Sequence, residues 1–109
     1  MMRDGSAAKA LEVIGDPQRR AILEILAECP CAVRTIADRL PISRPAVSRH
    51  LRLLKEAGLV SDEAVGSRRV YRLQQDGIEA IRSYFETLWR EAAARYRLVA
   101  ENHGTDSAK

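Results

Sequence analysis

Residues 43–60, SRPAVSRHLRLLKEAGLV, contain a helix start, an amphipathic pattern and a helix stop in direct succession. Ser43 is suited to cap a helix, because its side-chain oxygen can accept a hydrogen bond from a free backbone N–H group. Gly58 is suited to the left-handed conformation that commonly ends one. We therefore expect a helix over about residues 44–57.

The two sides of this helix differ in chemistry. At about 100° per residue, Val47, Leu51 and Leu54 fall within one narrow sector, which we expect to be buried. His50 lies on the shoulder of that sector. The opposite side carries Arg44, Pro45, Ser48, Arg49, Arg52, Lys55 and Glu56. One side is thus a core surface, and the other is rich in arginine and serine.

Three further helices are expected before this one. Asp16 followed by Pro17 is a strong helix start, because aspartate accepts from free N–H groups and proline has no N–H to lose. This helix should end before Pro30, which cannot continue it. The apolar spacing also predicts a helix over about residues 7–14 and a short one over about residues 33–40.

A hairpin and a long helix are expected after it. Residues 59–65 and 68–73 are rich in β-branched and aromatic side chains, and Gly66 and Ser67 between them suit a tight turn. From Asp76 onward, apolar residues recur every three or four positions, which predicts a final helix of some 25 residues.

Together these elements predict a mainly α fold with a small β hairpin, in the order four helices, two strands and a last helix. Two helices joined by a short turn and followed by a hairpin are typical of the winged helix-turn-helix. We expect one domain over residues 6–102, with flexible tails at residues 1–5 and 103–109.

Length and composition exclude several other classes. The chain has 109 residues, which leaves no room for a second domain. No apolar run is long enough to span a membrane, and residues 1–10 lack the apolar core of a secretory signal, so we expect a cytoplasmic protein. Phosphate-binding glycine loops, catalytic triads and paired carboxylates are also missing from the sequence, so neither an enzyme nor a cofactor is predicted.

The positive charge is concentrated in one part of the sequence. The formal net charge is +3, and residues 41–75 carry seven Lys or Arg against three Asp or Glu. Such a basic stretch is expected of a surface that meets the phosphates of a nucleic acid. A solvated basic face, or a winged-helix module that binds other proteins, are the alternatives.

A winged helix-turn-helix binds double-stranded DNA by inserting its second helix into the major groove, with the first residues of that helix toward the base edges. We expect Ser48 and Arg49 to contact bases, and Arg52 and Lys55 to contact phosphates. Arginines at the tip of the hairpin should reach the adjacent backbone or minor groove. The predicted DNA-binding residues are Ser43, Arg44, Pro45, Ser48, Arg49, Arg52, Lys55, Arg68 and Arg69.

Three stretches carry a resemblance to a known family. DPQRRAILEIL (16–26), TIADRLPISRPAVSRHLRLLKEAGLV (35–60) and GSRRVYRL (66–73) resemble the ArsR-type bacterial winged-helix transcriptional regulators, over nearly residues 7–100. The resemblance implies a cytoplasmic homodimer, built from the first and last helices, that represses an operon through an inverted-repeat operator.

The final helix carries more apolar side chains than packing on so small a body requires. Part of its stripe should therefore meet a partner, most simply a second copy of the chain. The predicted dimer residues are Leu11, Ile14, Ile81, Tyr84, Phe85, Leu88, Trp89 and Ala92.

Metal sensing in this family uses cysteines of the third helix or Asp, His and Glu ligands of the last helix. The cysteine positions fall here on Ala32 and Arg34, neither of which can ligate a metal. The last helix offers Glu79, Glu86 and Glu91, but no histidine before the tail. The chain therefore resembles the subgroup without a recognisable metal site.

Cys29 and Cys31 flank Pro30, near but outside the family's metal-binding positions. Two thiols one residue apart could share a soft ion or respond to oxidation, which would make the protein a thiol- or metal-responsive sensor. Alternatively, both side chains simply fill space near the end of the second helix. The sequence shows no other effector site, so a small molecule or a partner protein are both open as the signal.

Overall fold

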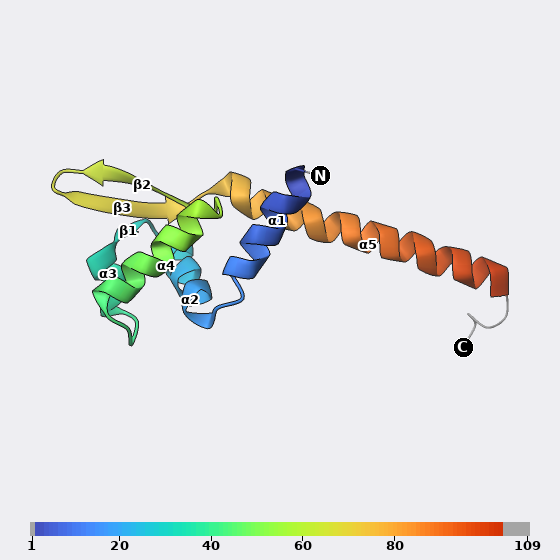
Figure 1. Ribbon diagram of the computed structural model, residues 1–109, viewed down its shortest axis with the longest axis horizontal. Coiled ribbons are helices and arrows are strands. Elements are labelled where there is room, and N and C mark those ends of the chain that lie inside the picture. Colours follow the sequence, from blue (N-terminus) through green and yellow to red (C-terminus); the bar gives the residue numbers. More distant parts are fainter. Residues whose placement is uncertain (1, 104–109) are drawn as a thin grey trace.

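The computed structural model describes residues 2–103 and contains five helices and three short strands (Figure 1). In chain order these are α1 (Met2–Val13), α2 (Pro17–Glu28), β1 (Cys31–Ala32), α3 (Val33–Asp38), α4 (Arg44–Glu56), β2 (Val60–Val65), β3 (Arg68–Leu73) and α5 (Gln75–His103). The mainly α architecture with a β hairpin is confirmed.

The predicted helix boundaries around α2 and α4 are set by the expected side chains. The Asp16 carboxylate accepts hydrogen bonds from the backbone N–H groups of Gln18 and Arg19, at 2.7 and 3.2 Å. Although burial opposes it, these two bonds hold the pKa of Asp16 below its ordinary value. Ser43 caps α4 in the same way, and Gly58 follows α4 with a φ of 78°.

Several features differ from the sequence-based expectation. Helix α1 begins at Met2, so residues 2–5, which were expected to lie in a tail, are helical. Asp4 and Gly5 are both weak helix formers, and the glycine costs about 1 kcal/mol. Extending an existing helix is less costly than starting one, so α1 continues over these residues. Helix α3 ends at Asp38, two residues early. The second predicted tail, residues 103–109, begins with His103, which is instead the last residue of α5; residues 104–109 lie outside the described residues.

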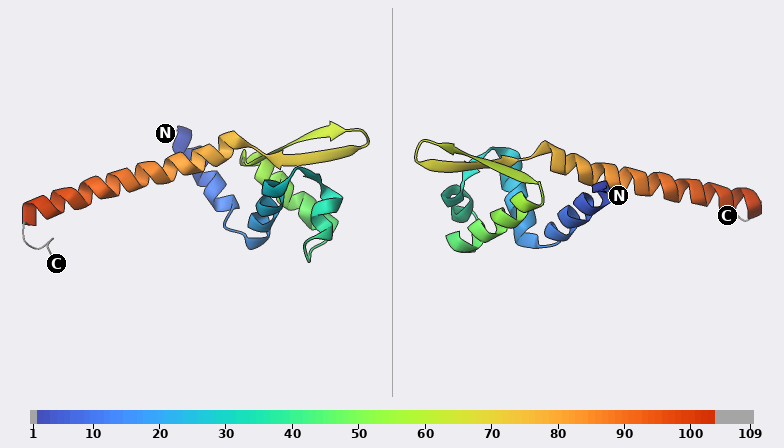
Figure 2. Two further views of the ribbon diagram at one scale, coloured as in Figure 1. Left: turned by 180° about the vertical axis from the view of Figure 1, so that it is seen from behind. Right: turned by 45° about the horizontal axis from the view of Figure 1, so that its top comes forward.

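A further difference is an additional strand, β1. Strand β1 pairs with β3 in an antiparallel register, with Cys31 opposite Tyr71 and Ala32 opposite Val70. Strand β3 therefore lies in the centre of a three-stranded sheet, and β2 lies at the other edge. Strand β1 supports the hairpin β2–β3 at the middle of β3, and the tip of the hairpin projects from the body (Figures 1 and 2).

The core lies where α2, α3 and α4 meet the base of the hairpin. Its largest fully buried side chains are Ile22, Ile36, Val47, Leu51, Leu54 and Leu59. The predicted inner side of α4, formed by Val47, Leu51 and Leu54, is thus confirmed as buried.

Helix α5 leaves the body at a fixed point. The backbone N–H of Gln74 donates to the carbonyl of Leu59 at 2.8 Å. A side chain at position 77 would collide with the carbonyl of Gly58, so the glycine there allows a close approach to the turn after α4. From this point α5 packs beside α1 and then runs on alone (Figure 2).

Candidate nucleic-acid interface

The outer side of α4 presents the predicted DNA-binding residues to solvent. Arg44, Pro45, Ser48, Arg49 and Arg52 are all exposed. The inner side of the same helix packs in the core, so the fold fixes which side of α4 faces outward and carries these residues. The structure thus brings these five side chains together on one surface.

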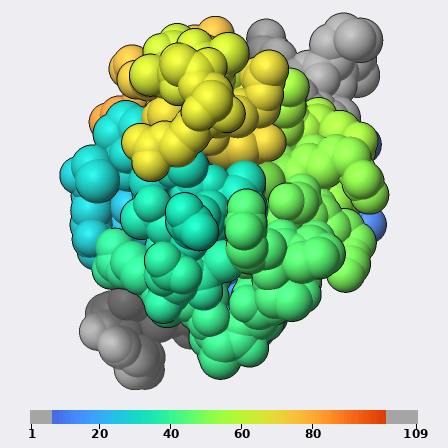
Figure 3. Space-filling view, turned by 90° about the vertical axis from the view of Figure 1, so that its left-hand side faces the viewer, coloured from blue at the N-terminus to red at the C-terminus, as the bar shows by residue number. Residues whose placement is uncertain are grey.

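The hairpin lies beside this surface. Gly66 adopts a φ of 64° at the turn, a conformation that glycine adopts without strain. Arg68 and Arg69 follow the turn and are exposed. Figure 3 shows this side of the molecule, with the hairpin (yellow) above α3 (teal) and α4 (green).

A groove runs between the hairpin tip and the first turns of α3 and α4. Its walls are formed by Ala32, Val33, Arg34, Arg44, Ser67, Arg68 and Arg69. A second hollow continues from it along α4, past Val33, Arg44, Pro45 and Ser48. Four arginines and no carboxylate line the first groove, which is the chemistry of an anion-binding surface.

Arg34 is not among the DNA-binding residues predicted from the sequence, because the only family motif that falls on it is the metal-binding one. The available signal was its place as an exposed charged residue at the start of α3. Its arrival beside Arg68 depends on the pairing of β1 with β3, which brings the first turn of α3 to the hairpin.

Two of the predicted phosphate ligands are engaged with an acidic residue of the hairpin. Asp62 on β2 accepts from Lys55 of α4 at 2.9 Å and from Arg69 of β3 at 3.1 Å. The Lys55 ammonium and the Arg69 guanidinium hold the pKa of Asp62 below its ordinary value. Sequence reasoning did not find this ion triad.

The other cations of the surface are differently placed. Within residues 7–100, no carboxylate lies within ion-pair distance of Arg34, Arg44, Arg49, Arg52 or Arg68. Among residues 7–100, the basic surface therefore has two classes of cation: those that face solvent without a carboxylate partner, and the two that neutralise Asp62.

His50 connects α4 to the other end of the body. Its Nδ1 atom lies 3.3 Å from Nη1 of Arg19, and the Nε of Arg19 donates to the carbonyl of Val13 at 2.6 Å. His50 is half-buried, in agreement with its expected place on the shoulder of the helix. Arg19 thereby links the last turn of α1 to α4.

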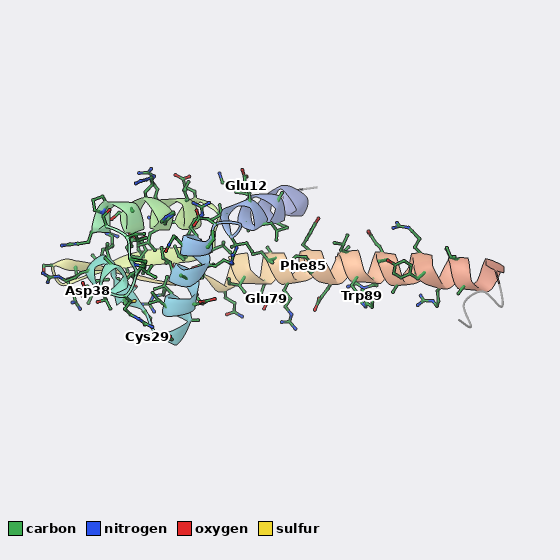
Figure 4. The ribbon with its side chains drawn as sticks, turned by 90° about the horizontal axis from the view of Figure 1, so that it is seen from below. Glu12, Cys29, Asp38, Glu79, Phe85 and Trp89 are labelled. Carbon is green, nitrogen blue, oxygen red and sulfur yellow. The ribbon has the colours of Figure 1, made fainter. Side chains whose placement is uncertain are left out.

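Neither cysteine lines the basic groove, although Cys31 directly precedes the groove residues 32–34. Cys29 is exposed at the end of α2 (Figure 4), and Cys31 on β1 is half-buried. Burial, together with the neighbouring Cys29, raises the pKa of the Cys31 thiol. In the part of the chain that the structure describes, no three His, Cys, Asp or Glu side chains come together as a possible metal site.

The predicted dimer residues fall into two groups. Ile14 and Ile81 pack partly against the core, and Leu11 and Tyr84 are also half-buried. Phe85, Leu88 and Trp89 are exposed on α5. Figure 4 shows the side chains of Phe85 and Trp89 on this helix. Ala92 is half-buried on the same helix. Tyr96, Leu98 and Val99 extend the exposed apolar surface beyond the predicted set.

No helix within the described residues is both long and apolar enough to cross a membrane.

The fold, the exposed basic side of α4 and the adjacent hairpin define the chain as a winged helix-turn-helix protein. Residues 16–62 match the family model described as "Bacterial regulatory protein, arsR family". The chain is 43% identical over 102 residues to the HTH-type transcriptional regulator Rv2034 of Mycobacterium tuberculosis, covering 94% of this chain and 95% of that protein. The chain belongs to the arsR family of bacterial regulatory proteins.

Solved structures agree with this assignment. An ArsR-like transcriptional regulator from Rhodococcus sp. RHA1 superimposes with a TM-score of 0.85 at 26% identity, over 93% of this chain and 95% of that one. The homodimeric winged helix-turn-helix DNA-binding domain of Mb0332 from Mycobacterium bovis gives a TM-score of 0.64, also at 26% identity, over 94% and 84% of the two chains.

Proposed function

We propose that this protein is a transcriptional regulator that binds an inverted-repeat operator as a homodimer and represses transcription by occupying the promoter. The observation that carries the proposal is the continuous basic surface formed by the outer side of α4, the start of α3 and the hairpin tip. A helix about 10–12 Å across fits a B-DNA major groove about 12 Å wide. Because the bacterial chromosome lies in the cytoplasm, we propose that the protein acts there.

Within this surface, the residues have different proposed roles. Ser48 and Arg49 lie on the outer side of α4 near its N-terminal half, where base edges would be within reach. Arginine can donate two hydrogen bonds to guanine, worth about 1–3 kcal/mol of discrimination. Arg44, Arg52 and Arg68 are proposed to contact phosphates, together with Ser43, Pro45 and Arg34 at the edge of the contact.

Two copies are needed to recognise an inverted repeat. The exposed apolar side chains of α5, with the partly buried ones of α1, are the proposed contact between copies. The related Mb0332 domain, which is homodimeric, supports this proposal. A two-fold dimer would place two α4 helices about one DNA turn apart.

A salt titration of DNA binding tests the proposal against the alternative of a module that binds only proteins. Each phosphate contact adds about 0.9 to the slope of log affinity against log salt concentration, so binding to a mixed-sequence duplex should weaken steeply with salt. Replacing Arg52 by glutamine should reduce the slope by about 0.9. Arg82→Gln on α5 is the matched control, with the same change of charge away from the surface, and should leave the slope unchanged. No binding at low salt, or equal effects of both variants, would contradict the proposal.

A further inference from the structure

The ion triad of Asp62, Lys55 and Arg69 joins the hairpin to α4. Oδ1 of Asp62 contacts Nζ of Lys55 at 2.9 Å, and Oδ2 contacts Nη1 of Arg69 at 3.1 Å, so each carboxylate oxygen holds a different cation. Only 7% of the Asp62 side chain is exposed, whereas those of Lys55 and Arg69 are about half exposed, at 54% and 55%. The carboxylate thus has a cation on each oxygen, and both cations remain about half exposed.

The two partners of Asp62 cannot leave it without a loss of contact. Each cation that turns away gives up a charge-assisted hydrogen bond to its own carboxylate oxygen. If Lys55 or Arg69 turned toward a DNA phosphate, it would leave Asp62 under-neutralised and facing a second negative charge. The carboxylate and the phosphate therefore compete for the same two cations.

The neighbouring acidic residue of β2 provides a contrast. Successive residues of a strand point to opposite faces, so Glu63 lies on the face of the hairpin opposite to Asp62. It has one ion pair, to Arg72 at 3.3 Å, and its side chain is 60% exposed. A single exposed pair of this kind contributes little, because water and salt screen it.

We propose that Asp62 limits sequence-independent DNA binding by holding Lys55 and Arg69 in ion pairs that compete with DNA phosphates. This inference rests on the proposed function of the basic surface. In this view the arginines without a carboxylate partner contact the DNA phosphates. Asp62 keeps Lys55 and Arg69 from adding further phosphate contacts to theirs.

The test is a salt titration of Asp62→Asn, Glu63→Gln and the wild type on a short labelled duplex of mixed sequence, followed by fluorescence anisotropy. Release of two cations should steepen the slope of log affinity against log salt concentration by up to about 1.8 for Asp62→Asn. Lowering the salt from about 200 to about 50 mM should then raise the affinity of this variant roughly ten times more than that of the wild type. Glu63→Gln makes the same change of charge one residue away and should leave the slope within about 0.5 of the wild type.

Three outcomes would overturn the inference. Equal slopes for Asp62→Asn and Glu63→Gln would show that only net charge matters. An unchanged slope for Asp62→Asn would show that the cations are not restrained. Weaker binding of Asp62→Asn at every salt concentration would show that Asp62 instead orients its partners toward DNA. Failure of all three proteins to bind at low salt would contradict the proposed function rather than this inference.

Variants of a cation give an independent measurement, which also serves if Asp62→Asn does not fold. In the otherwise wild-type protein, Lys55→Gln and Arg69→Gln should leave the slope nearly unchanged, whereas Arg52→Gln should lower it by about 0.9. In the Asp62→Asn background, Lys55→Gln should lower the slope by about 0.9 as well. An equal effect of Lys55→Gln in both backgrounds would contradict the competition.

Discussion

Replacing Trp89 by alanine tests the contact proposed between two copies. Trp89 is 68% exposed on the part of α5 that extends beyond α1. A tryptophan side chain can bury about 200 Å², so about 140 Å² is available to a partner. If half of that area is covered, its loss costs about 1.7 kcal/mol at about 25 cal/mol per Å². A two-fold interface contains the substitution twice, so the dimer should weaken by about 3.5 kcal/mol, or roughly 300-fold in its dissociation constant.

Sedimentation velocity over a dilution series measures this change directly. The matched control is Val65→Ala, which truncates an exposed apolar side chain at the hairpin tip and should change the dimer by less than about 0.5 kcal/mol. The Trp89 variant should also lose more affinity for DNA with two half-sites than for DNA with one. A Trp89 variant that dissociates like the control, or a wild type that is monomeric throughout, would refute the reasoning.

The remaining predictions concern α4, the start of α2 and the thiols. Arg49→Ala should cost about 1–3 kcal/mol of discrimination at one base pair of each half-site, whereas Arg52→Ala should weaken binding to all duplexes equally. Affinities for single-base variants of a selected duplex measure both effects. The same pattern of losses for the two variants would contradict a base contact by Arg49 and a phosphate contact by Arg52. Asp16→Ala should lower the free energy of unfolding by about 1 kcal/mol near neutral pH. The pKa of Asp16 is lower in the folded protein than in the unfolded chain, where it is about 3.9. The stabilisation by Asp16 is therefore fully present above about pH 3.9 and is lost as the pH falls through the folded pKa. Urea denaturation should show the difference in unfolding free energy between wild type and Asp16→Ala shrinking in acid. Alkylation followed by peptide mass mapping should modify exposed Cys29 before Cys31, whose thiol pKa is raised; equal rates would contradict the described burial.

The helices could be predicted from sequence because their signals are local. Asp16 and Ser43 cap helices within three residues of themselves, and the spacing of Val47, Leu51 and Leu54 alone defines the buried side of α4. Once the inner side of a helix is known, its outer side follows from geometry. For this reason the exposed arginines of α4 were found without any knowledge of the tertiary structure.

The missed features all depend on contacts between distant segments. Strand β1 has only two residues and no local pattern, and it exists because Cys31 and Ala32 pair with β3 some forty positions later. The same pairing brings Arg34 to the hairpin. Likewise, the position of Asp62 between Lys55 and Arg69 requires both the register of the hairpin and its packing on α4. Charge counts could show that the region is basic, but not which cations are already neutralised.

Selection of bound sequences from a random duplex pool, followed by hydroxyl-radical footprinting of the selected DNA, tests the central claim most directly. If two copies each place the outer side of α4 in a major groove, the selected DNA should contain an inverted repeat with two protected tracts about 10 base pairs apart. Arg49→Ala should relax the sequence preference within both tracts. A pool that is not enriched at low salt, or a single protected tract without symmetry, would contradict this account.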